Sequence, residues 1–184
     1  MWNLLASQLL YASARGANCE FWITEYVRYE CLVKPRGTHS DEQRELARRL
    51  LAELAEGRIP FAHVSIADLQ APDMLKLRRN LGKGELSALA FALKTRQALF
   101  TDDQGMRKEV HRVSVSPPAQ TTPGLLGWLV FIGHLLDQDV PRVIDEHSSL
   151  GRPLRTQFAI MHMRGLEFRA RASVSGRADS GDGQ

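Results

Sequence analysis

Hydrophobic residues recur along this chain at the spacing of helices, with shorter apolar runs between them. Residues 2–14 carry apolar side chains three and four positions apart. Residues 40–43, Ser-Asp-Glu-Gln, form a capping box, in which the Ser and Gln side chains accept free backbone N–H groups at a helix start. Gly57 is a typical end signal. The sequence therefore predicts an amphipathic helix between Ser40 and Gly57, with an inward face of Leu46, Leu50, Leu51 and Leu54.

The same analysis predicts the order of the remaining elements. Further helices are expected at residues 25–33, 68–79, 85–94, 122–136, from 141 onward and at 155–168. Short apolar runs predict strands at residues 19–24, 59–66, 98–101 and 112–116. Because strands that alternate with helices are typical of parallel sheets, we expect an α/β fold, a three-layer α/β/α parallel sheet.

Length and composition limit the organisation of the protein. A chain of 184 residues is long enough for one domain, which we place at residues 1–170. Residues 171–184 are rich in Ser, Gly and Asp and are predicted to be a disordered tail. Hydrophobic residues make up 43% of the chain and charged residues 24%, which is typical of soluble globular proteins.

Charge, cysteine content and hydropathy indicate which substrates and which cellular location the protein can have. The 24 Lys and Arg residues outnumber the 21 Asp and Glu residues, so a basic surface for acidic substrates, nucleic acid included, is allowed. Two cysteines cannot form a disulfide framework, which favours a reducing, cytoplasmic location. The longest apolar run, residues 124–136, is shorter than the roughly 20 residues that a membrane-spanning helix needs, and we expect no membrane segment and no signal peptide.

Four acidic residues lie where they could hold a metal ion. Asp102 and Asp103 follow the predicted strand 98–101, Glu30 follows the predicted strand that ends near Thr24, and Glu85 opens a helix. In parallel sheets, ligands gather at the carboxyl ends of the strands, and hard cations such as Mg²⁺ prefer oxygen ligands. Each residue also has a structural interpretation: Glu30 as a solvated helix residue, and the others as helix-start or turn residues.

Other chemistries find less support in the sequence. The histidines are scattered and lack zinc-binding spacing. Residues 82–85, Gly-Lys-Gly-Glu, lack the spacing of a phosphate-binding loop. A phosphoacceptor receiver domain also groups acids at strand ends, but their order along this chain does not match one.

Three segments together resemble the PIN domain family, the metal-dependent ribonuclease fold of many toxins in bacterial type II toxin-antitoxin pairs. They are residues 24–30 (TEYVRYE), 84–107 (GELSALAFALKTRQALFTDDQGMR) and 121–130 (TTPGLLGWLV). The resemblance implies that Glu30, Glu85 and Asp103 are catalytic, metal-binding acids. Asp102 fits the variable position between Thr and Asp, as a supporting metal-site acid or a spectator, and Thr101 lies beside the acids.

The resemblance also implies a cofactor, a substrate and partners. The cofactor would be Mg²⁺ or Mn²⁺, the substrate RNA, and the protein partners an antitoxin and a second copy of the chain in a homodimer. Four basic residues flank the acids and are expected to contact substrate phosphates: Arg78, Arg79, Lys83 and Arg107. Their alternative interpretation is an ordinary solvated helix face.

The chain departs from the family pattern at its start. The family begins with a strand that ends in a metal-binding Asp, whereas residues 1–7, MWNLLAS, already have the pattern of the helix that follows. One hypothesis is that an upstream segment supplies the strand and the Asp, which completes an endoribonuclease. The other is a degenerate, non-catalytic PIN-like binding module engaged by a protein partner.

Overall fold

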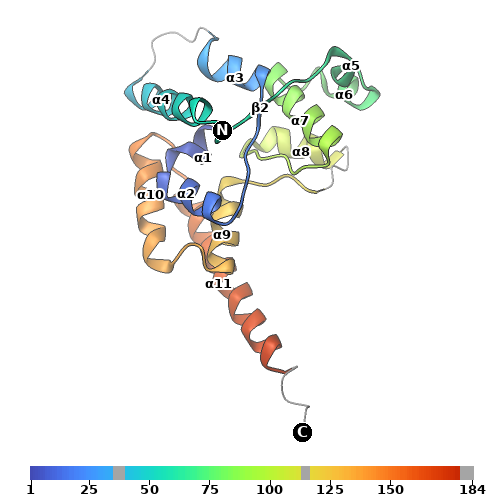
Figure 1. The fold of residues 1–184 in the computed structure, drawn as a ribbon. Coiled ribbons are helices and arrows are strands. Elements are labelled where there is room, and N and C mark those ends of the chain that lie inside the picture. Colours follow the sequence, from blue (N-terminus) through green and yellow to red (C-terminus); the bar gives the residue numbers. More distant parts are fainter. Residues whose placement is uncertain (35–39, 113–116, 179–184) are drawn as a thin grey trace. The chain divides into compact units, whose positions relative to one another are not determined.

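The computed structural model describes residues 1–34, 40–112 and 117–178, and the chain divides into two compact units. Unit 1 contains residues 20–121 together with Met1, and unit 2 contains residues 2–19 and those from 122 onward. Figure 1 follows the elements of both units along the chain. Each unit is described separately below.

Unit 1 contains two short strands and six helices in its described residues. They are β1 (Ile23–Thr24), α3 (Glu25–Leu32), α4 (Asp41–Ala55), β2 (Phe61–Ala62), α5 (Ile66–Leu69), α6 (Pro72–Leu77), α7 (Lys83–Thr95) and α8 (Gln104–Arg112). Strands β1 and β2 pair in parallel, with Ile23 opposite Phe61. A separate parallel bridge joins Phe100 to Gln120.

The predicted three-layer α/β/α parallel sheet is therefore wrong. Helices make up 68% of the structure, and the strands in its described residues are two short parallel ones. The physical reason lies in the residues that follow each apolar run. Thr24 ends β1 because its side chain accepts the backbone N–H of Val27 and starts α3. Ser65 forms a capping box with Asp68 and starts α5 shortly after β2.

The other two predicted strands also differ from the structure. Residues 98–101 contribute a single bridge at Phe100 instead of a strand. Arg112 is the last residue of α8, and residues 113–116 lie outside the described part of the chain.

Most helix predictions are confirmed. The capping box of Ser40 and Gln43 starts α4, whose Leu46 and Leu50 are buried, although Leu51 is exposed. The predicted helix at residues 68–79 is replaced by the short helices α5 and α6, and Pro72 begins the second of them. The buried core of unit 1 is centred on α6, α7 and α8 and includes Met74, Leu77, Leu81, Leu86, Leu89, Ala90, Leu99, Met106 and Val110.

Unit 2 is entirely helical in its described residues. Its elements are α1 (Trp2–Ala6), α2 (Gln8–Gly16), α9 (Thr122–Ile132), the 3₁₀ turn η1 (Asp137–Asp139), α10 (Val140–Ser149) and α11 (Arg155–Ala178). Ser7 divides the predicted helix of residues 2–14, because its side chain accepts the Leu10 N–H and starts α2. None of the helices in the described segments is long and apolar enough to cross a bilayer. The prediction of one domain followed by a tail stays a prediction.

Helices α9 and α11 pack with their backbones in direct contact. A Cβ atom at Gly127 would lie 2.6 Å from the carbonyl oxygen of Met161, and one at Gly165 would clash with the carbonyl oxygen of Gly127. The two glycines therefore permit an approach that no other residue allows. Arg169 of α11 strengthens the contact, because its guanidinium donates to the carbonyl oxygens of Val130 and Phe131 at the end of α9.

We expect Gly127→Ala to destabilise the protein by about 1–3 kcal/mol, because the added methyl group forces the two backbones apart. Gly16→Ala is the matched control, since the nearest atom to its Cβ would be 3.9 Å away. Urea unfolding followed by circular dichroism measures both changes. Equal midpoints for the two variants would contradict the backbone contact.

Candidate functional site

Glu30 lies at the amino end of α7. The last turn of α3 carries its side chain there, and its Oε1 accepts the backbone N–H of Gly84 at 3.2 Å. A Cβ at position 84 would clash with the Glu30 carboxylate, so only glycine allows this approach. The partial positive charge of a helix start also favours a carboxylate at this place.

A chain of hydroxyl groups fixes α3 and α7 in this arrangement. Ser87 Oγ donates to the Gly84 carbonyl oxygen at 2.8 Å, so its only proton is used there. Thr24 must then be the donor in the buried 2.6 Å bond between the two hydroxyl oxygens. Thr24 Oγ1 in turn accepts the backbone N–H of Val27. We refer to this chain, Val27 to Thr24 to Ser87 to Gly84, as the hydroxyl relay.

Neither Thr24 nor Ser87 is among the site residues predicted from the sequence. Both lie inside the segments on which the family resemblance rests, and both are buried polar residues. Burial of a hydroxyl group is unfavourable unless it is hydrogen-bonded. The available signal was a hydroxyl residue among the small and apolar residues of α7. Its partner, 63 positions away, could not be identified from the sequence.

The other two acids predicted to be catalytic, Glu85 and Asp103, stabilise helix starts. Glu85 Oε2 accepts the N–H of Gly82 at 2.8 Å at the start of α7. Asp103 Oδ1 accepts the N–H of Met106 at 2.7 Å at the start of α8, and the N–H of Asp103 donates to Thr101 Oγ1. Asp102 is half-buried directly before it.

The predicted acids carry the donor atoms that a divalent metal ion needs. Carboxylate oxygens are the donors that Mg²⁺ prefers. Glu30, Glu85 and Asp103 each engage a backbone N–H through one oxygen, as described above. Within residues 1–34, 40–112 and 117–178, however, no three His, Cys, Asp or Glu side chains are placed to hold one metal ion. The structure thus brings Glu30 to the turn that contains Glu85 without forming a three-ligand site.

The basic residues predicted to contact substrate are exposed. Arg78 follows α6, Arg79 comes next, Lys83 is the first residue of α7, and Arg107 lies on α8. None of these four forms an ion pair with another part of the described chain. They are available to bind phosphate groups.

Glu109 of α8 is a buried acid that the sequence analysis missed. Its Oε1 accepts hydrogen bonds from Asn80 at 3.3 Å and from Arg112 at 2.8 Å. Its Oε2 is buried and has no hydrogen-bond partner in the described residues. An acid within the polar pattern of α8 resembles any exposed helix residue, so no signal in the residue pattern indicated its burial.

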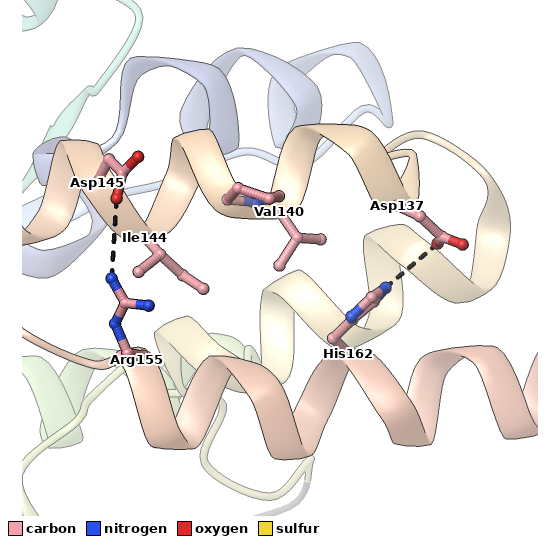
Figure 2. Close-up of a pocket in the computed structure, with 7 residues that line it drawn as sticks. Asp137, Val140, Ile144, Asp145, Arg155 and His162 are labelled. Atoms are coloured by element: carbon pink, nitrogen blue, oxygen red, sulfur yellow. Dashed lines mark hydrogen bonds and ion pairs between the residues drawn. The ribbon is translucent and has the colours of Figure 1, made fainter.

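Unit 2 has a surface pocket of about 220 Å³ along α10 and α11. Asp145 and Arg155 face each other at one end at 3.9 Å, and His162 Nε2 lies 3.2 Å from Asp137 at the other end (Figure 2). Apolar side chains of α10 lie between these pairs. Each end pairs an acid with a base, so the pocket has no excess positive charge for a phosphate group.

Comparison with known proteins identifies no relative of this chain. No family model, no curated protein and no solved structure matches it.

We expect Ser87→Ala to lower the free energy of unfolding by about 1–3 kcal/mol, because the buried Thr24 hydroxyl loses its acceptor. Thr95→Ala is the matched control, since the Thr95 hydroxyl also donates to a carbonyl oxygen of α7 but is exposed. It should change stability by less than about 0.5 kcal/mol. Chemical denaturation measures both values, and an equal effect of the two substitutions would contradict the hydroxyl relay.

Proposed function

We propose that this protein is a Mg²⁺- or Mn²⁺-dependent endoribonuclease whose substrate site lies at the amino end of α7. The observation that carries the proposal is the position of Glu30. Its carboxylate comes from α3 and reaches the N–H of Gly84, directly beside Glu85. Two carboxylates from distant parts of the sequence thus lie at one helix start, where exposed basic residues are also found.

A two-carboxylate site is sufficient for the proposed ion. Mg²⁺ is usually held by one or two carboxylates, with waters and substrate phosphates as its other ligands. Glu30 and Glu85 would hold the ion together with an RNA phosphate, and Asp103 would act from the start of α8. When bound, the ion would activate a water molecule and stabilise negative charge on the phosphoryl group. The backbone N–H groups that engage the carboxylates keep them oriented.

The remaining parts of the proposal rest on the family resemblance. We propose that the protein acts in the cytoplasm as the toxin of a type II toxin-antitoxin pair, with an antitoxin as partner and a homodimer as its assembly. Lys83, Arg78, Arg79 and Arg107 would contact RNA phosphates, and Thr101 would lie beside the substrate. The exposure of the four basic side chains supports this assignment.

A second candidate is a non-catalytic PIN-like binding module engaged by a protein partner. The observation that favours it is that no three potential ligands in the described segments converge on one ion. Under this alternative, Glu30, Glu85 and Asp103 serve only to stabilise the starts of α7 and α8. RNA cleavage distinguishes the two candidates.

We expect the protein to cleave a fluorescently labelled single-stranded RNA when Mg²⁺ or Mn²⁺ is added, and EDTA to abolish cleavage. Glu30→Gln, Glu85→Gln and Asp103→Asn should each lower the rate at least about tenfold, because a metal ligand or its charge is removed. These amides retain an acceptor oxygen, so the helix starts are preserved.

Glu42→Gln is the matched control for these variants. Glu42 is an exposed acid in the first turn of α4, and its replacement should leave the rate unchanged. Absence of cleavage by the wild-type protein at every metal concentration would contradict the proposal and favour the binding module. Equal rates for the wild type and all three amide variants would show that the measured cleavage does not come from this site.

We expect the double substitution Arg78→Ala and Arg79→Ala to weaken RNA binding. It should also reduce the slope of log affinity against log salt by about one for each RNA phosphate that is no longer neutralised. Fluorescence anisotropy at several salt concentrations measures both effects. Arg164→Ala, an exposed arginine of α11, is the control. An unchanged slope for the double variant would remove these two residues from the RNA-binding surface.

A further inference from the structure

His147 is fully buried in unit 2, on the last turn of α10. Its Nδ1 lies 2.9 Å from the carbonyl oxygen of Val143, one turn earlier on the same helix. Its Nε2 lies 2.8 Å from the carbonyl oxygen of Asn3 on α1. The ring therefore links two helices that are 144 positions apart in the sequence.

The chemistry of these two contacts determines the protonation state of the ring. A backbone carbonyl oxygen only accepts hydrogen bonds, so both ring nitrogens must donate. Neutral imidazole has one N–H group, and its other nitrogen would face a carbonyl oxygen with its lone pair. Both bonds can form together only when His147 is the doubly protonated imidazolium.

Two effects offset part of the cost of burying a positive charge at His147. The carbonyl groups at the end of α10 favour a cation there. The Phe158 ring of α11 packs edge-to-face with the His147 ring, with centroids 4.7 Å apart. Hydrogen bonds from a charged donor are also about twice as strong as those between neutral groups.

Glu146, the neighbour of His147, binds the start of the next helix. Its Oε2 accepts the Ser7 hydroxyl at 2.7 Å and the Leu9 N–H at 3.3 Å, and Arg142 donates to its Oε1. Burial alone would raise the pKa of Glu146, but these hydrogen bonds outweigh it, so the pKa lies below its ordinary value.

Other charged and titratable groups lie on the elements around His147. On α10 and α11, Asp145 and Arg155 face each other. Arg152 follows α10, and its backbone N–H donates to the carbonyl oxygen of His147. Helix α1 has no titratable side chain within its bounds, and α2 has Arg15 in its last turn and Tyr11.

We propose that Glu146 and His147 form a pH-dependent clamp that holds α1 and α2 against α10, with His147 in its imidazolium form. The Glu146 carboxylate binds the start of α2, and the His147 imidazolium binds the Asn3 carbonyl of α1. Loss of either charge removes hydrogen bonds from one of the two helices. The clamp is complete only within a limited range of pH.

The direction of the pH dependence follows from the two groups. The carboxyl group of Glu146 has a lowered pKa in the folded state, so its contribution is present above about pH 4.3, the usual unfolded value, and is lost as the pH falls through the folded pKa. The His147 contribution is complete below about pH 6.5 and is lost as the pH rises through its folded value. The clamp is therefore strongest between these limits.

The state of the His147 ring can be measured directly in the wild-type protein. We expect long-range ¹H–¹⁵N NMR spectra to show both ring nitrogens of His147 protonated at about pH 6.5, the ordinary midpoint, with a titration midpoint above that of free histidine. A ring with a single protonated nitrogen at that pH, or a midpoint at or below the ordinary value, would overturn the proposal.

Hydrogen exchange tests the consequence for α1 and α2. Protection factors of their amides, corrected for the intrinsic pH dependence of exchange, should fall by up to about tenfold per pH unit between the ordinary and the folded pKa of His147. His147→Gln should abolish this decrease, whereas His63→Gln, at an exposed histidine of unit 1, should retain it. Protection that is independent of pH in the wild-type protein would contradict the clamp.

Discussion

Unit 1 depends on the hydrogen bond between the hydroxyl groups of Thr24 and Ser87. It joins the end of β1 to the first turns of α7, and each of the two hydroxyl groups also holds a backbone group. Because both are buried, their donors and acceptors must be satisfied within the protein. This requirement fixes the start of α3 relative to α7 and thereby brings Glu30 to the N–H of Gly84.

The same physical requirement operates in unit 2 through backbone groups. Arg169 donates to the carbonyl oxygens at the end of α9, and the ring nitrogens of His147 lie within hydrogen-bond distance of those of Val143 and Asn3. Helices α9 and α11 contact each other at Gly127 and Gly165, where the absence of side chains permits close packing. Buried polar groups and small residues therefore add specific contacts between the helices of this unit.

The proposed active-site acids combine a structural and a chemical role. Each stabilises a helix start with one carboxylate oxygen, and this hydrogen bond also limits the directions in which the group can point. A stabilising role alone is satisfied by Asn or Gln, because these residues also accept N–H groups. Only the chemical role requires negative charge. The isosteric amides separate the two roles for this reason.

The sequence by itself determined the local structure. The capping box at Ser40 and the glycine after α4 defined that helix, because such signals act within one turn of the backbone. Sequence alone also placed a helix start at Glu85, where α7 begins two residues earlier. It overestimated the sheet, since apolar runs predict burial as well as strands, and Thr24 and Ser65 start helices shortly after only two paired residues.

The contacts between distant residues became visible only in the folded chain. The bonds of Ser87 with Thr24, of His147 with Asn3 and of Glu30 with Gly84 join residues 54 to 144 positions apart. A single sequence contains no signal for such pairs, because their energy depends on burial and direction rather than on residue type. For the same reason the spacing of Glu30, Glu85 and Asp103 suggested one shared ion, whereas the fold assigned each acid to a helix start.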